Sequence, residues 1–131
     1  MTNVVGTVNL LNDLNFEIHR LGQIKNNTVL GLKLKSKKQM DDFGGMVSFN
    51  LKGNKLEDAI KLVSTTHYFT LAESLGGVES LIGHPASMTH AAIPKQVREK
   101  TGVVDTLIRL SVGVEDIEDL VDDLKMALDS L

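Results

Sequence analysis

The sequence predicts an α+β fold, in which a small, mostly antiparallel sheet carries helices on one face. Residues 45–51 and 104–112 alternate apolar and polar side chains, which is the period of half-buried strands. Residues 56–63 and 117–131 repeat apolar side chains at helical spacing, so each helix presents one apolar stripe. A sheet with one apolar face and helices with one apolar stripe bury these surfaces against each other.

Length and composition are those of one compact domain. The chain has 131 residues, of which 42% are hydrophobic and 24% charged. Its net charge of −3 provides no basic field for nucleic acid or an anionic membrane. Cysteine is absent, which excludes disulfides and thiolate catalysis and is compatible with the cytoplasm. No apolar run reaches a membrane-spanning length and no signal peptide opens the chain, so we expect a cytoplasmic protein.

The first 38 residues carry weaker signals. Apolar residues recur at helical spacing behind a plausible N-cap at Asp13, which predicts an amphipathic helix from about Asp13 to Ile24. Four lysines gather in residues 33–38. Because no aromatic residues lie among them, a solvated linker is favoured over a nucleic-acid patch.

The next elements are a helix and a strand. Asn54 can cap a helix together with Glu57, three residues later. The apolar stripe of this helix is formed by Leu56, Ala59, Ile60 and Val63. Residues Tyr68 to Ala72 then predict a short strand.

Residues 68–90, YFTLAESLGGVESLIGHPASMTH, predict the wall of a site. Two short strands are joined by a bend at residues 76–77, a glycine doublet that lets the backbone turn sharply or approach a ligand. Glu73 and Ser74 precede the bend, and the polar residues Ser87, Thr89 and His90 follow the second strand. Polar side chains between buried strands cost free energy unless they find partners, which is why we expect a ligand here.

The C-terminal part begins with a short helix, bounded by Pro94 at its first position and Gly102 just past its end. In the strand from Val104 to Val112, even-numbered residues share one face, so Arg109 points away from the helices. Acidic residues at 115 and 116 favour the start of the last helix. Its stripe is Ile117, Leu120, Val121, Leu124, Leu128 and Leu131.

The candidate residues also have plainer interpretations. Arg109, lying between apolar neighbours, fits a carboxylate that it binds bidentately, or else an ordinary surface ion pair. Glu73 can simply be solvated at a strand end, and Ser74 and Thr89 can make local turn hydrogen bonds.

Two further kinds of site receive little support. Glu73 and Glu79 form a pair of carboxylates, but nothing in the sequence fixes the separation that acid/base catalysis needs. His84 and His90 lie six residues apart, whereas zinc sites show tighter ligand pairs. We therefore predict no catalytic residue and no metal site.

Three segments resemble a known family: DFGGMVSFNL at 42–51, TLAESLGGVESLIGHPASMTHA at 70–91 and LIRLSVGVEDIEDLVDDL at 107–124. They look like the C-terminal domain of the Cys/Met-metabolism enzymes, which use pyridoxal phosphate (PLP) and include cystathionine γ-lyase, cystathionine γ-synthase and methionine γ-lyase. The resemblance implies the C-terminal domain of a fold-type I PLP enzyme at 39–131, preceded at 1–38 by a remnant of the large domain and its linker helix. The implied chemistry is elimination or replacement at a carbon–sulfur bond of a sulfur amino acid.

The resemblance also implies roles for four residues. Arg109 matches the family arginine that binds the substrate α-carboxylate, and Thr89 a threonine near that carboxylate. Glu73 and Ser74 match residues that line the cofactor and substrate pocket. The lysine that forms the imine with PLP has no counterpart, nor do the phosphate cradle and the aspartate that pairs with the pyridine nitrogen. The chain is thus expected to be a truncated family member, which leaves its cofactor residues unknown and puts PLP binding by this chain alone in doubt.

The implied partners are a sulfur amino acid and another protein chain. Because the family sheet packs on a large domain, we expect exposed apolar surface around Phe69, Leu71 and Leu107, which would drive self-association or binding to a full-length family member. Whether the chain is an enzyme stays open. The alternative is a catalytically silent module that binds amino acids or a paralogue.

Overall fold

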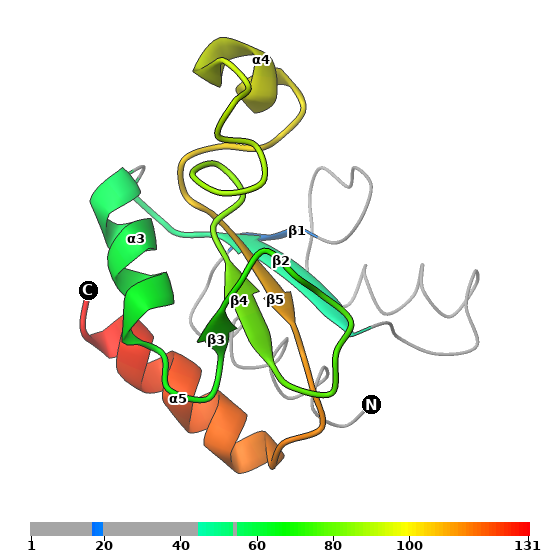
Figure 1. Ribbon diagram of the computed structural model, residues 1–131. Coiled ribbons are helices and arrows are strands. Elements are labelled where there is room, and N and C mark those ends of the chain that lie inside the picture. Colours follow the sequence, from blue (N-terminus) through cyan, green and yellow to red (C-terminus); the bar gives the residue numbers. More distant parts are fainter. Residues whose placement is uncertain (1–16, 20–44, 54) are drawn as a thin grey trace, which may run out of the picture.

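The computed structural model describes residues 17–19, 45–53 and 55–131. Its strands are β1 Glu17–His19, β2 Met46–Asn50, β3 Thr70–Leu71, β4 Leu81–Gly83 and β5 Leu107–Ser111, and its helices are α3 Leu56–Thr65, α4 Lys95–Lys100 and α5 Ile117–Asp129. The strands form one sheet in the order β1-β2-β5-β4-β3 (Figure 1). Every pairing is antiparallel except that of β3 with β4. The predicted α+β fold is confirmed.

The central strands β2 and β5 have the predicted alternation. Val47 lies opposite Leu110 and Phe49 opposite Ile108, and all four side chains are buried. Arg109 lies on the other face of β5, opposite Ser48 of β2, and is half-buried. The strand period therefore separates a core face from a face that carries the arginine.

Helices α3 and α5 cover the core face of the sheet (Figure 1). The core cluster consists of Val47, Phe49, Leu51, Ala59, Leu62, Val63, Phe69, Ile82, Ile108, Leu110, Leu120, Leu124 and Ala127. Each large apolar side chain buried in this way contributes about 1.5–3 kcal/mol to folding. None of the described helices is both long enough and apolar enough to cross a membrane.

Helix α3 differs in detail from its prediction. Its N-cap is Lys55, which makes no side-chain cap hydrogen bond, and the predicted cap Asn54 lies outside the described residues. The buried residues of α3 are Ala59, Leu62 and Val63. Leu56 and Ile60 of the predicted stripe are 40% and 39% exposed, because the helix turns Leu62 rather than these residues toward the sheet.

Helix α5 starts as predicted. Asp116 is its N-cap, and the Asp116 carboxylate accepts a hydrogen bond of 2.8 Å from the Glu118 N–H. Its buried residues are Leu120, Asp123, Leu124 and Ala127. Leu131 follows the end of the helix and is 44% exposed, so it does not belong to the buried stripe.

Residues Glu17–His19 form a strand where a helix from Asp13 to Ile24 was predicted. They pair antiparallel with β2, with Ile18 opposite Phe49. The pairing satisfies backbone groups along the edge of β2, and this outweighs the helical spacing of the apolar residues. The rest of that predicted helix, and the boundary at residue 38, lie outside the described residues.

Strands β3 and β4 are parallel, so the glycine doublet does not form a hairpin. Thr70 lies opposite Leu81 and Leu71 opposite Ile82. Residues 72–80 must therefore run back along the sheet before β4 begins. Gly76 has a φ of 76° in this stretch, a conformation that favours glycine. The predicted strand from Tyr68 to Ala72 is reduced to two residues by this path.

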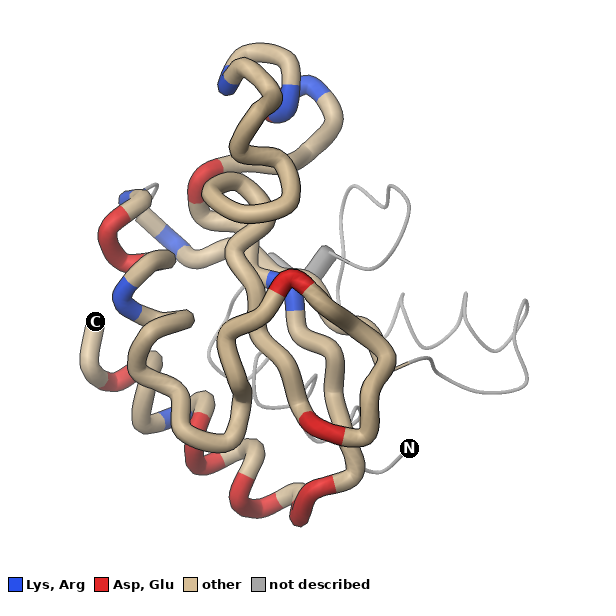
Figure 2. Tube along the Cα trace, viewed as in Figure 1, with Lys and Arg blue, Asp and Glu red and all other residues tan. Residues whose placement is uncertain are grey.

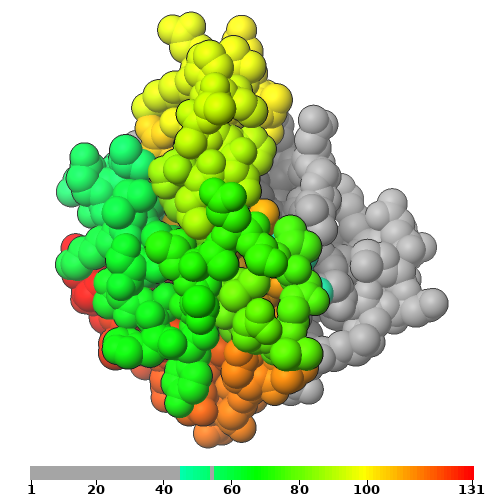
Figure 3. Space-filling model, viewed as in Figure 1, coloured from blue at the N-terminus to red at the C-terminus, as the bar shows by residue number. Residues whose placement is uncertain are grey.

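Residues 84–105, here called the α4 lobe, project from the end of the sheet (Figures 1 and 3). Pro94 is the N-cap of α4, one position earlier than predicted. Gly102 follows the helix with a φ of 89°, and its N–H donates to the Glu99 carbonyl at 3.0 Å, as expected of a glycine at a helix end.

Candidate functional site

Arg109 is held on the face of β5 opposite the helices. Its Nη2 donates to the backbone carbonyls of Glu73 at 2.9 Å and Ser74 at 3.3 Å. Within the described residues, both of its hydrogen bonds start from this one nitrogen. Within the described residues Nη1 and Nε have no acceptor, and either of these donors can give a charge-assisted hydrogen bond to a carboxylate.

Gly83 lets the chain close around this guanidinium. Gly83 lies opposite Arg109 in the sheet. A Cβ atom at residue 83 would lie 3.1 Å from the Ala72 carbonyl oxygen and 3.8 Å from Arg109 Nη2. A side chain here would therefore crowd both the start of the loop and the arginine.

The loop of residues 73–80 runs along the Arg109 face of β5 and the turn after it. Every second residue from Arg109 onward forms a hydrogen bond with the loop. The second of these is Ser111, whose Oγ accepts from the Gly76 N–H at 2.8 Å. Next is Gly113, whose N–H donates to Ser80 Oγ at 2.8 Å. A Cβ atom on Gly113 would clash with the Val78 carbonyl oxygen, so the loop packs directly on the glycine. The RLSVG segment thus uses its core-facing residues for packing and the intervening ones for holding the loop.

Glu115 completes this attachment. Its carboxylate accepts from the Ser80 N–H at 2.6 Å and from the Ser80 hydroxyl at 2.7 Å. Burial acts to raise the pKa of Glu115, but the two hydrogen bonds from Ser80 outweigh it, and the pKa lies below its ordinary value. The carboxylate is therefore charged near neutral pH.

The structure brings together three of the four predicted site residues. Arg109, Glu73 and Ser74 meet, but Glu73 and Ser74 contribute their carbonyls while their side chains are exposed. Thr89 lies in the α4 lobe, where its Oγ1 hydrogen-bonds His90 Nδ1 at 2.8 Å. This contact is the local turn interaction that the sequence left open for Thr89.

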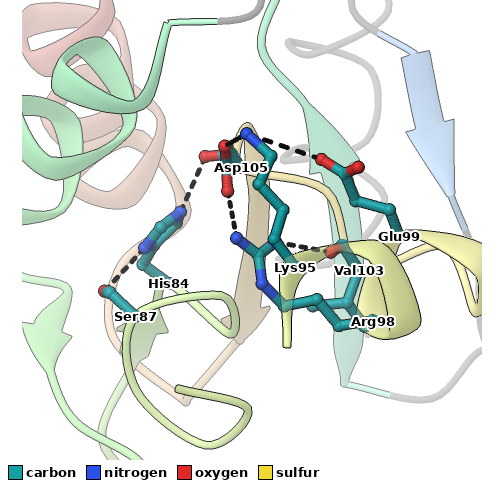
Figure 4. A network of polar contacts seen from close by, with 7 residues as sticks. All are labelled: His84, Ser87, Lys95, Arg98, Glu99, Val103 and Asp105. Atoms are coloured by element: carbon teal, nitrogen blue, oxygen red, sulfur yellow. Dashed lines mark hydrogen bonds and ion pairs between the residues drawn. The ribbon is translucent and has the colours of Figure 1, made fainter. Parts of the chain in front are cut away.

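The base of the α4 lobe is closed by a polar network around His84 (Figure 4). The buried His84 ring contacts Ser87 Oγ through Nδ1 at 2.7 Å and the Asp105 carbonyl through Nε2 at 2.8 Å. A carbonyl only accepts, so Nε2 donates to Asp105, while Nδ1 shares its hydrogen bond with the Ser87 hydroxyl. His84 thus has a structural role, and the residues that the structure describes contain no group of three potential metal ligands.

Asp105 anchors the rest of this network. Its carboxylate binds Lys95 and Arg98, and Arg98 Nη1 also donates to the Val103 carbonyl at 2.8 Å (Figure 4). The hydrogen bonds from Lys95 and then Arg98 hold the pKa of Asp105 below its ordinary value, while the same contact raises the pKa of Lys95. Arg98 is buried, so its charge is balanced inside the lobe.

Asp123 is a buried polar residue whose anchoring role the sequence did not reveal. Its buried carboxylate accepts backbone N–H bonds from His67, Tyr68 and Phe69 at 2.7, 2.8 and 3.0 Å. The sequence feature that could have identified Asp123 is an acidic residue next to the apolar position 124 of the last helix. A cleft of about 560 Å³ opens beside it, on the helix side of the sheet and away from Arg109. The cleft is lined by His67, Tyr68, Asp119, Asp122, Asp123 and Met126.

A PLP site requires a lysine whose amine can form an imine with the cofactor. In the described part, lysines occur at 52, 55, 61, 95, 100 and 125. These positions belong to α3, the turn before it, α4 and α5, whereas β5 and the 73–80 loop carry no lysine. The charged residues that Figure 2 shows on this loop are acidic. The elements around Arg109 therefore fit a carboxylate but offer no amine for an imine, so they do not by themselves form a PLP site.

Comparison with known proteins agrees with this geometry. The sequence pattern of the Cys/Met metabolism PLP-dependent enzymes matches residues 32–129. Cystathionine β-lyase of Lactococcus lactis is 63% identical over 95 residues, which cover 72% of this chain and 24% of that protein. Cystathionine γ-lyase of Saccharomyces cerevisiae is 59% identical over 85 residues, covering 65% of this chain and 21% of the yeast protein.

A solved structure gives the same result. Cystathionine γ-synthase of Xanthomonas oryzae pv. oryzae, in complex with aminoacrylate and cysteine, superposes with a TM-score of 0.80 and 42% identity, covering 98% of this chain and 32% of that one. The chain thus spans about a quarter of the length of the curated relatives it matches. On these grounds, the chain belongs to the Cys/Met metabolism family of PLP-dependent enzymes.

Proposed function

We propose that this chain forms the carboxylate-binding part of a PLP-dependent enzyme of the cystathionine lyase or synthase type, which eliminates or replaces a carbon–sulfur bond of a sulfur amino acid. The observation that carries the proposal is the Arg109 guanidinium, which two carbonyls hold through Nη2 while Nη1 and Nε make no hydrogen bond to a described residue. Residues outside the described part supply the PLP lysine. PLP, when bound, provides the electron sink that such chemistry needs.

The guanidinium suits this task because it is always charged and presents parallel donors. A charge-assisted hydrogen bond from Nη1 or Nε to the carboxylate contributes about 1.5–3 kcal/mol, and the fixed plane of the guanidinium restricts the orientation of the bound amino acid. Binding of this kind orients the substrate but lowers no chemical barrier on its own. Activity therefore requires the residues that supply the PLP lysine as well, and the exposed side chains of Glu73 and Ser74 would face those residues or the ligand.

The test is calorimetric titration of the purified chain with L-cystathionine and L-methionine. We expect binding that weakens about tenfold in Arg109→Lys, because a flexible ammonium replaces the planar guanidinium that the two carbonyls hold in place. Lys125→Gln, which removes an exposed positive charge from α5, is the matched control and should bind like the wild type. If the wild type shows no binding, or Arg109→Lys binds equally well, the carboxylate role is wrong.

Exposed apolar residues support association with another chain. They lie on the segment before β4 and on the turn after β5: Tyr68, Leu71, Leu75, Val78 and Val114, which are 48%, 45%, 54%, 71% and 79% exposed. The expectation for Phe69 is wrong, because this side chain is 1% exposed within the core, and Leu107 is half-buried. Leu71 alone of the three expected residues is well exposed. We take the occupant of this surface to be the part of the enzyme that supplies the PLP lysine.

Mixing experiments distinguish the enzyme part from a silent module. The chain is combined with a family member whose Arg109 equivalent has been removed, and complex formation is followed by sedimentation and lyase activity by product release. Recovery of activity with wild-type chain, but not with Arg109→Lys, supports the enzyme part. A complex without recovered activity favours a paralogue-binding module. A monomeric chain in every mixture contradicts both.

A further inference from the structure

Ser111 and Glu115 attach the loop that provides acceptors for the Arg109 guanidinium. Ser111 Oγ binds the Gly76 N–H, and the Glu115 carboxylate binds both the N–H and the hydroxyl of Ser80. These contacts fix the middle and the end of the 73–80 loop. The Glu73 and Ser74 carbonyls at its beginning then lie against Nη2 of Arg109.

We propose that Ser111 and Glu115 are positioning residues for Arg109: by holding the 73–80 loop along β5, they keep the Glu73 and Ser74 carbonyls on Nη2 and thereby fix the orientation in which the guanidinium meets the ligand carboxylate. The effect of this positioning on ligand affinity rests on the proposed function, in which Arg109 binds a carboxylate. Its structural part, the control of the guanidinium by the loop, is independent of any ligand.

The two carbonyl contacts cannot order the loop without help. They join an exposed part of the chain to a half-buried arginine, and one of them is 3.3 Å long. The loop contains two adjacent glycines, whose backbone loses much conformational entropy on ordering. The hydrogen bonds at Ser111 and Ser80 lie in more protected surroundings, since these two side chains are 3% and 0% exposed. They are therefore the contacts that hold the loop in place.

The same geometry explains why residues of these types occupy alternate positions. Arg109, Ser111 and Gly113 share one face of the extended chain, and each meets a successive part of the loop. Glu115 follows at the next alternate position and binds the residue directly before β4. A loop attached at each of these points cannot slide along β5, so the guanidinium keeps one orientation.

The experiment measures the guanidinium directly in the ligand-free full chain. Rotation about the Nε–Cζ bond of Arg109 is followed by NMR in the wild type, Ser111→Ala and Glu115→Gln, together with hydrogen exchange of the Gly76 and Ser80 amides. Glu115→Gln retains the volume of the side chain. The matched controls are Ser130→Ala and Glu118→Gln, which alter the same residue types at the ends of α5.

We expect faster exchange at the Gly76 amide in Ser111→Ala and at the Ser80 amide in Glu115→Gln. Arg109 should rotate about fivefold faster in both variants and at the wild-type rate in both controls. Unchanged rotation in either folded variant overturns the proposal, as does equal acceleration in a control. If Ser111→Ala does not fold, Glu115→Gln decides alone.

Ligand titration then separates this proposal from the proposed function. If the wild type binds L-methionine, its dissociation constant should rise about fivefold in both variants while circular dichroism stays unchanged. If the wild type binds no carboxylate, the proposed function fails, but the rotation measurement still decides whether Ser111 and Glu115 position Arg109. If rotation is accelerated but the affinity is unchanged, the positioning has no effect on binding, and the part of the proposal that concerns ligand affinity is overturned.

Discussion

Replacing Asp123 with alanine should destabilise the protein far more than any neighbouring acidic substitution. The carboxylate accepts three backbone N–H bonds at 2.7–3.0 Å from the turn between α3 and β3. The Phe69 N–H is in buried surroundings, so losing its acceptor costs about 1–3 kcal/mol. His67 and Tyr68 are exposed, and water can replace their acceptor at a cost of roughly 0.5–1 kcal/mol each.

The sum is about 3 kcal/mol, which for a domain of this size lowers Tm by roughly 10–15 °C. Urea denaturation followed by circular dichroism measures the loss. Asp122→Ala is the matched control, because Asp122 is the exposed neighbour on the same helix. Asp123→Asn, which retains one acceptor oxygen, should lie between the alanine variant and the wild type. Equal losses in Asp123→Ala and Asp122→Ala would refute the anchoring role of the carboxylate.

Three further predictions concern the loop and the lobe. Gly113→Ala should cost about 1–3 kcal/mol in urea denaturation, since its Cβ meets the Val78 backbone; a change within error would contradict this packing. The pKa of Glu115 is lowered by folding, so its stabilisation is complete above the ordinary carboxyl pKa and disappears as pH falls through the lowered value. A Tm series below neutral pH should therefore be flatter in Glu115→Gln, and an equally steep series would count against it. Asp105→Asn should cost about 3 kcal/mol by leaving the buried Arg98 without its anion; thermal melts check this, with the exposed Glu99→Gln as the control expected to change little.

Side-chain periodicity predicted the parts of the fold in which burial decides conformation. The alternation around Ile108 and Leu110 placed Arg109 on the opposite face, and the structure confirms this. It failed where backbone pairing decides. The spacing around Ile18 is helical, but the edge of β2 recruits this stretch as a strand.

For the candidate site, the residues were predicted but the contacts between them were not. The sequence placed Glu73 and Ser74 near Arg109, but it could not show that their carbonyls make the contact, because carbonyls are common to all residues. The parallel pairing of β3 with β4 was missed for a related reason, since a glycine doublet permits a hairpin and a returning loop equally. Asp123 was missed because its partners are backbone groups more than fifty positions away in the chain.

The hydrogen bond from His84 to the Asp105 carbonyl joins the two stems of the α4 lobe where they leave the sheet. The residues between His84 and Asp105 therefore lie beyond a closed base and do not take part in the strand pairing. Substitutions on α4 that spare the Asp105 network, such as those at the exposed Gln96 and Lys100, should leave the arginine of β5 where it is, which makes this helix the natural place for a fluorescent label.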